Sequence, residues 1–339
     1  MSGTPPGVAP PQRRAASGAG LTGFVSAPLS GQVRSSIGVA QDDDPVRAIH
    51  QAAAAARRSG GDEAPKAALV VSAGAAPADA LRAAARESLR GIPIAGAPVA
   101  GILTDNGVLT AGAAVMCFFG EMLFPSGACG GRAAGLRAAT ERVGRLILSG
   151  ACDRRHYPRG LALAFARPIA GSCVAEFLQP WRHIAGPKLR TIFSATSEEA
   201  LYGPCSEDPG VLTVLTLEGT YESGLGVASG FVPGETIPDA TTLVHGAADA
   251  AATAVKRLEG HSVRAALIAE SAPRHAALGI AARDEWMAVR EQIGADVPCL
   301  GWLTRVEFGA GRGVVATAET GSVVVAALGD APAAPSKAS

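Results

Sequence analysis

Two stretches of the chain repeat the same order of apolar and polar positions. Each begins with a continuously apolar run, continues through an alanine-rich stretch of helical periodicity to an apolar-Pro-x-x-Gly step, and ends in an apolar run flanked by glycines. In the two copies these parts lie at 67–72 and 265–270, at 92–96 and 297–301, and at 112–120 and 321–329. A duplicated strand–helix–strand–hairpin unit predicts a pseudo-symmetric α/β protein of two parts, with its functional site near their junction.

A third, less faithful unit is predicted between the two copies, at 161–217. Helices of ten or more residues separate most of the predicted strands, which indicates parallel pairing, and the hairpins add antiparallel strands. We therefore expect mixed sheets flanked by helices. The predicted strands are 35–40, 67–72, 92–95, 99–104, 108–119, 161–165, 189–193, 211–217, 265–269 and 297–300, with a final hairpin to 327. The predicted helices are one that residues 42–45 cap and that ends near 58, and those at 77–90, 132–148, 172–183, 247–258 and 276–293.

The two ends of the chain differ from the rest in composition. Residues 1–22 and 330–339 are rich in Pro, Gly, Ala and Ser without apolar periodicity, which is typical of disordered tails. Between them we predict an N-terminal domain at 23–209 and a C-terminal domain at 210–329.

The stretch 91–120 is apolar enough to suggest a membrane span. It carries a single charge, Asp105, but it also holds two prolines, several glycines and a Thr-Asp-Asn-Gly turn at 104–107. Asn and Gly accept the positive φ of hairpin turns, so we predict buried strands here and no membrane insertion.

The charge balance excludes some partners. With 30 basic and 30 acidic residues the formal net charge is zero, which gives no electrostatic reason to expect nucleic acid or an anionic membrane. The six cysteines form no Cys-x-x-Cys pair in a chain too large to need disulfides. We interpret them as reduced thiols of a cytoplasmic protein.

At the Gly-led loops the sequence resembles the FIST family, a bacterial sensory module with paired N- and C-terminal parts. The family pattern is the apolar-Pro-x-x-Gly step followed by a small-residue loop ending in Gly-Glu. The first copy has Gly96 and Gly101 but Ile102 in place of the Glu, and the second has Gly301 and Glu307 but Val306 in place of the Gly. The resemblance implies a cytoplasmic, non-catalytic signal-transduction protein that binds a small polar metabolite, such as an amino acid, and acts through a partner protein.

Ligands of open α/β sheets bind beyond the carboxyl ends of the strands, where these loops fall. Bare glycine backbone would admit a ligand, Arg305 would clamp a carboxylate and Glu307 would pair with an ammonium. Alternatively, the glycines only permit tight packing and Glu307 pairs with a nearby arginine. The candidate ligand-binding residues are Gly96, Gly101, Thr104, Ser194, Thr196, Gly301, Thr304, Arg305 and Glu307.

Two other function classes stay open. One is a hydrolase with a Ser or Cys nucleophile, because Ser72 follows a strand and precedes a helix as in a nucleophile elbow, although Val70 replaces the leading glycine. The other is a haem-dependent gas sensor with His183 as axial ligand. We expect no metal and no bound cofactor other than that haem. The Gly-rich segment 127–131 is predicted to be a plain loop.

Overall fold

The computed structural model of the 339-residue chain describes residues 33–121, 123–130, 135–150, 159–167, 173–186, 189–196, 200–204, 210–231, 236–310 and 321–330. The predicted disordered tails lie outside these ranges, except Asp330, as does the start of the helix predicted at 132–148.

The described residues form three mixed sheets with helices outside them, which confirms the predicted fold class. The first sheet has the order β1-β6-β2-β3, the second β14-β9-β8-β10-β7 and the third β11-β15-β12-β13-β4-β5. The strands are β1 Arg34–Ala40, β2 Ala67–Ala73, β3 Ile94–Pro98, β4 Gly101–Thr104, β5 Gly107–Leu109, β6 Gly112–Phe119, β7 Leu123–Gly130, β8 Arg159–Ala166, β9 Leu189–Ala195, β10 Leu212–Gly219, β11 Glu222–Ala228, β12 Val263–Ser271, β13 Cys299–Thr304, β14 Val306–Ala310 and β15 Val323–Gly329. The helices are α1 Pro45–Ser59, α2 Ala78–Ser88, α3 Leu136–Gly150, α4 Cys173–Ala185, α5 Ala240–Lys256, α6 Ala272–Leu278 and α7 Ala282–Ile293, with a 3₁₀ turn at Gly279–Ala281.

Local sequence sets the start of α1. The side chain of Asp44 accepts hydrogen bonds from the backbone N–H groups of Val46 and Arg47, and Pro45 occupies the first helical turn. Both features stabilise a helix N-terminus, since they satisfy or remove N–H groups that have no partner within the helix. The predicted start of this helix is confirmed.

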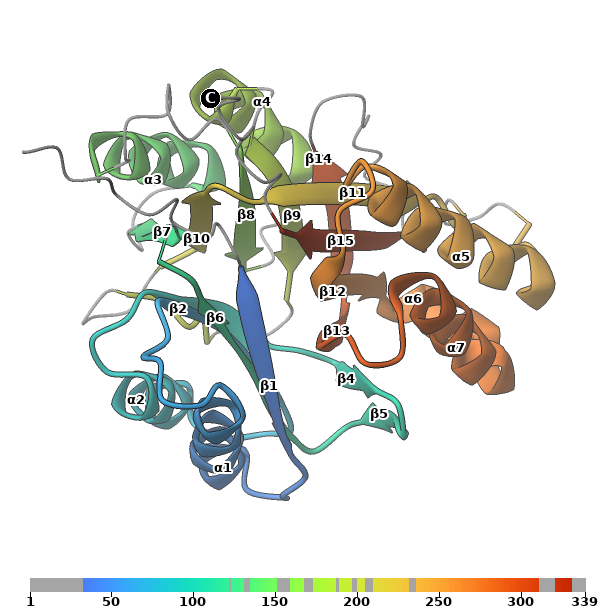
Figure 1. Cartoon of the computed structure of the whole chain (residues 1–339), viewed down its shortest axis with the longest axis horizontal. Coiled ribbons are helices and arrows are strands. Elements are labelled where there is room, and N and C mark those ends of the chain that lie inside the picture. Colours follow the sequence, from blue (N-terminus) through green and yellow to red (C-terminus); the bar gives the residue numbers. More distant parts are fainter. Residues whose placement is uncertain are drawn as a thin grey trace, which may run out of the picture.

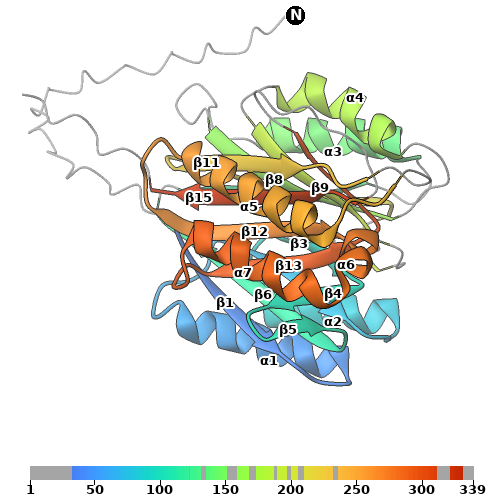
Figure 2. The same cartoon turned by 90° about the vertical axis from the view of Figure 1, so that its right-hand side faces the viewer.

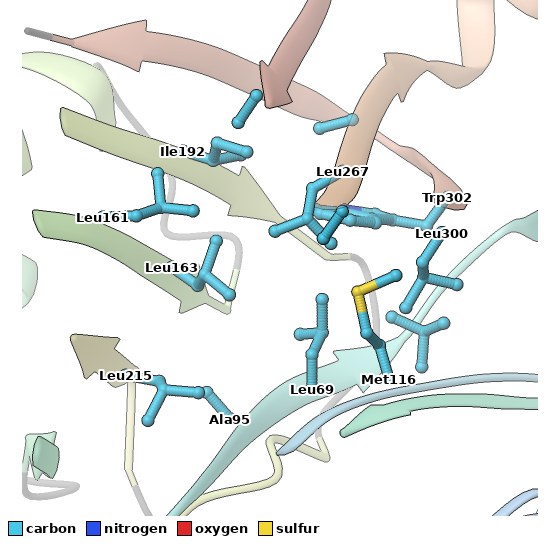
Figure 3. Packing of buried hydrophobic residues seen from close by; sticks show 14 of the residues in the cluster. Leu69, Ala95, Met116, Leu161, Leu163, Ile192, Leu215, Leu267, Leu300 and Trp302 are labelled. Atoms are coloured by element: carbon cyan, nitrogen blue, oxygen red, sulfur yellow. The ribbon is translucent and has the colours of Figure 1, made fainter. Parts of the chain in front are cut away.

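The three sheets enclose one apolar centre. In Figure 1 the pair α1 and α2, the pair α3 and α4, and the group α5 to α7 lie on three sides of the strands; Figure 2 gives the view from the side. Side chains from all three sheets meet inside, among them Leu69 of the first, Leu163 of the second and Trp302 of the third (Figure 3). Strands covered by helices on one face and by this centre on the other are buried on both, which explains their continuously apolar sequences.

The three units exchange strands in a cycle. After β3 the chain crosses to the third sheet, where β4 pairs with β13, and after β13 it crosses to the second sheet, where β14 pairs with β9. After β9 it returns to the first sheet, where the backbone N–H of Tyr202 donates to the carbonyl of Gly96 at 2.8 Å. The sheets also cross the domain boundary expected near residue 210, because β10 pairs with both β7 and β8.

Three predictions about single elements are wrong. The strand predicted at 108–119 is two strands in different sheets, because the chain turns at Gly112, whose φ is +141° and where a Cβ would lie 2.3 Å from the carbonyl oxygen of Ala40. The helix predicted at 276–293 is broken at Gly279, where φ is +53°. Gly127 to Gly130 of the predicted loop belong to β7, because small residues let this strand pack closely on Pro204 and α3.

The prediction of six reduced cysteines is wrong at Cys129, which is disulfide-bonded. Cys117 and Cys299 are free thiols. In the stretch that suggested a membrane span, the structure has the strands β3 to β6, as predicted. No helix in the described part of the chain is long and apolar enough to cross a membrane.

Candidate functional site

The predicted ligand-binding glycines are packed against protein. A Cβ on Gly96 would lie 1.7 Å from the carbonyl oxygen of Val70, and one on Gly101 2.5 Å from a methyl group of Val108. Gly301 is similarly close to Leu103 and to the ring of Trp286. In the structure these glycines let backbone and side chains approach each other. This agrees with the alternative prediction that the glycines only permit tight packing.

The predicted polar residues do not gather in one place: Thr104 lies in a hairpin turn, whereas Thr196 and Ser194 bond to residues of other sheets. Thr104 closes the β4–β5 turn by donating to the carbonyl of Gly107 at 2.8 Å. Thr196 donates to the carbonyl of Pro98 at 2.7 Å, and so joins the first and second units. Ser194 accepts a hydrogen bond from Nε1 of Trp302 at 3.0 Å and lies opposite Glu307 in the β9–β14 ladder. Arg305 is exposed between β13 and β14.

A buried polar cluster surrounds Glu307 at the carboxyl ends of β12 and β13. We call it the β12–β14 cluster. Most of its side chains are 0 to 4 % exposed, although several of them are ionisable. Its members are Glu270 and Ser271 at the end of β12, Arg274 and His275 of α6, Glu285 of α7, Thr304 of β13, Glu307 of β14 and Ser322 before β15.

Arg274 and Glu285 form a fully enclosed ion pair. The Arg274 side chain is 0 % exposed and its Nη2 lies 2.9 Å from Oε2 of Glu285. Its remaining N–H groups donate to the carbonyl oxygens of Gly321 and Leu243. Burial raises the pKa of Glu285 to about 7, the negative charge of Glu270 adds to the rise, and Arg274 opposes it. This pair ties α6 to α5, α7 and the segment before β15.

Glu307 is held by hydroxyl groups and not by a positive charge. Its Oε1 lies 2.6 Å from the hydroxyl of Ser322, and its Oε2 accepts from Thr304 at 3.0 Å. Burial raises the pKa of this carboxyl to about 8, so it is largely protonated at neutral pH. Among the described residues no arginine forms an ion pair with Glu307, so the arginine alternative for this residue is wrong.

His275 is the accessible member of the cluster. Its Nδ1 lies 3.1 Å from Oε1 of Glu270, and its side chain is 22 % exposed while that of Glu270 is 6 % exposed. The hydrogen bond to Glu270 raises the pKa of His275, against the opposing effect of partial burial. With Nδ1–H donating to the carboxylate, Nε2 carries the lone pair and has no hydrogen-bond partner in the described ranges.

Replacing Glu307 by Gln is expected to change the pH dependence of stability. A carboxyl with a folded pKa of about 8 keeps a proton that the unfolded chain releases near pH 4.5, so the free energy of unfolding falls as pH rises between these values. Glu307→Gln removes up to about 1.4 kcal/mol per pH unit from that slope, because the amide does not titrate. Urea unfolding across this pH range measures it. Glu291→Gln, exposed on α7, serves as control, and an unchanged slope in Glu307→Gln contradicts the assignment.

Sequence reasoning found Thr304 and Glu307 of this cluster and missed its other six members, Glu270, Ser271, Arg274, His275, Glu285 and Ser322. A signal was present, since Glu270 to His275 places four polar or ionisable residues directly after an apolar run. The pairing of Glu285 with Arg274 had no sequence signal, because the break at Gly279 that orients α7 was not predicted.

The alternative nucleophiles whose side chains the structure describes are enclosed or disulfide-bonded, and those of Cys152, Cys173 and Cys205 lie outside the described part. Ser72 is 0 % exposed and its hydroxyl lies 2.6 Å from the hydroxyl of Tyr202. Burial raises the pKa of the Cys117 and Cys299 thiols to about 11 and about 12, which disfavours the reactive thiolate. His183 uses Nδ1 in a hydrogen bond with the carbonyl of Gln179 on its own helix. The described residues contain no group of His, Cys, Asp and Glu suited to a metal ion.

Comparisons with known proteins add structural likenesses only. No protein-family model matches the chain, and no curated protein matches it. The solved structure of cyanuric acid hydrolase from A. caulinodans is 11 % identical with a TM-score of 0.45, over 89 % of this chain and 100 % of that one. T. maritima PurL complexed with ATP is 10 % identical with a TM-score of 0.29, over 91 % of this chain and 75 % of that one.

We predicted that the chain is not an enzyme; the similar solved structures, which include a hydrolase, contradict that prediction, and we do not propose it again. At these identities and TM-scores the likenesses carry no argument about a reaction or a substrate. The chemistry proposed for this chain therefore rests on the β12–β14 cluster alone.

Proposed function

We propose that the chain is a hydrolase that acts on a small polar substrate at the β12–β14 cluster, with His275 as general base. The observation that carries the proposal is the His275–Glu270 pair at the carboxyl ends of the strands. A carboxylate on Nδ1 fixes the imidazole and stabilises its protonated form, which leaves Nε2 to take a proton from outside. Clustered ionisable groups with shifted pKa values are typical of functional sites.

Water is the nucleophile in this proposal, because Ser72 and Ser271 are fully buried and already hydrogen-bonded. Nε2 of His275 removes a proton from water as the water oxygen bonds to the substrate's acyl carbon. The same proton then passes from His275 to the leaving nitrogen or oxygen as its bond to that carbon breaks. Water thus supplies the hydroxyl of one product and the hydrogen of the other.

Arg305 is proposed to bind a carboxylate of the substrate. It follows Thr304, whose Cα partner across the sheet is Ser271, the residue immediately before α6. Arg305 is therefore an exposed residue at the end of β13, the strand that contacts α6, the helix of His275. A protonated Glu307 adds no negative charge that would repel an anionic substrate. The FIST resemblance supports a small-molecule site at Thr304 to Glu307, and we retain that membership as a proposal.

The test is hydrolysis of a panel of small esters, linear amides and cyclic amides, each with and without a carboxylate. We expect turnover that His275→Gln lowers by about a hundredfold or more, in the usual range for loss of a general base. The rate rises with pH through the raised pKa of His275, since only the neutral imidazole accepts a proton. Arg305→Ala raises KM for the carboxylate substrates and spares the uncharged ones.

His245→Gln is the matched control, because His245 is exposed on α5 outside the cluster. Turnover that is equal in the two histidine variants overturns the proposal, and so does a panel without any turnover. A panel compound can also raise the melting temperature without being hydrolysed. If Arg305→Ala abolishes that rise, the site binds a ligand as the FIST resemblance implies and does not hydrolyse it.

A further inference from the structure

A second candidate site lies between α3 and α4, on a different side of the molecule from α6 and α7 (Figure 1). The two helices leave a groove of about 470 Å³ between them. They approach each other closely at Gly144, where a Cβ would lie 2.5 Å from Cδ1 of Ile184. Ile184 and Pro180 provide the apolar part of the groove lining.

The α3 side of the groove has a regular order of charges. Arg137, Glu141 and Arg145 follow one another at intervals of four residues and so lie on one face of the helix. Leu148, three residues further, continues this face and is 44 % exposed. From Arg137 to Leu148 the face extends over about 16 Å at 1.5 Å per residue.

Positive charge is in excess in this groove. Glu141 lies 3.6 Å from Arg137, which balances one of the two arginines. Arg145 has no hydrogen bond or ion pair with any other residue that the structure describes. On α4, Nδ1 of His183 forms a hydrogen bond with the carbonyl of Gln179, and its Nε2 has no hydrogen-bond partner in the described part of the chain.

We propose that this α3–α4 groove binds an acidic amphipathic segment of a partner polypeptide. Arg145 is expected to pair with a carboxylate of that segment, and Ile184 and Leu148 to contact its apolar side chains. The length of the charged face and the apolar side chains of Leu148 and Ile184 beside it favour a peptide over a single small anion, which would occupy only one end. The chain's own terminal segments do not fit, since residues 1–32 and 331–339 contain no Asp or Glu.

The test measures fluorescence anisotropy with the full chain and a library of labelled peptides of about 14 residues. Each peptide carries Glu at intervals of four residues and Leu or Phe between them. We expect binding that Arg145→Glu weakens by about tenfold or more and that higher salt also weakens. Arg142→Glu makes the same charge change at an exposed position of α3 outside the groove lining, and it is expected to retain most of the affinity.

Three results overturn the proposal. They are equal binding by the Arg145 and Arg142 variants, equal binding of peptides with Gln in place of Glu, and absence of binding by every library peptide. In the last case, binding of inorganic phosphate or phosphatidylserine vesicles at Arg145 would show which anion the groove takes instead. Both substitutions lie on an exposed helix face, so unfolding does not account for a loss of binding, and circular dichroism of each variant checks this.

Discussion

Arg274→Ala is expected to destabilise the protein by about 3–5 kcal/mol, the usual cost of removing one partner of a buried ion pair. Arg274 is fully buried, and its loss leaves Glu285 without a counter-charge and the carbonyl groups of Gly321 and Leu243 without their donor. Urea unfolding at fixed pH measures the change, with exposed Arg283→Ala on α7 as the matched control.

The loss in Arg274→Ala is expected to grow as pH rises. Without the arginine the pKa of Glu285 rises further, so the folded state holds a proton that the unfolded state has released, and stability falls with pH until that pKa is passed. A double variant, Arg274→Met with Glu285→Leu, removes both charges and is expected to recover most of the lost stability. A loss below about 1 kcal/mol in Arg274→Ala contradicts the enclosed ion pair.

Trp302→Ala is expected to cost about 3–5 kcal/mol through the cavity it leaves at the centre of the molecule. Trp302 is 0 % exposed on β13, its ring lies 5.7 Å from that of Phe165 on β8, and its Nε1 donates to Ser194 on β9. One side chain thus joins the third sheet to the second. Figure 3 shows Trp302 among the apolar side chains of the centre. Thermal or urea unfolding measures the loss.

Trp302→Phe separates packing from hydrogen bonding in the same position. It keeps an aromatic ring but leaves the buried Ser194 hydroxyl without the Nε1–H donor of Trp302. We expect this variant to lower the free energy of unfolding by about 1–3 kcal/mol. Met287→Ala on α7, where the methionine is 52 % exposed, is expected to change stability by about 0.5 kcal/mol or less. If Trp302→Ala is as mild as Met287→Ala, the three sheets do not depend on this contact.

Only two of the eight residues of the candidate site were predicted from the sequence. Thr304 and Glu307 were found because they end a repeated strand, a pattern local to one segment. Ser322, the partner of Glu307, lies directly before β15, and Arg274 meets Glu285 only because Gly279 breaks a helix that the apolar periodicity predicts as continuous. Such contacts depend on how separate segments are placed in space, and periodicity carries no information about that placement.

The sequence by itself determined the type and order of most elements, because helix caps such as Asp44 and continuously apolar strands such as β2 act within a few residues. It also determined the repeated unit. Only the tertiary structure decided that β4 and β14 cross into the sheets of neighbouring units, that Gly96 faces backbone, and that Glu307 is buried among hydroxyl groups. The physical reason is that strand pairing and burial are decided by partners distant in the chain, whereas capping and hydrophobic alternation are local.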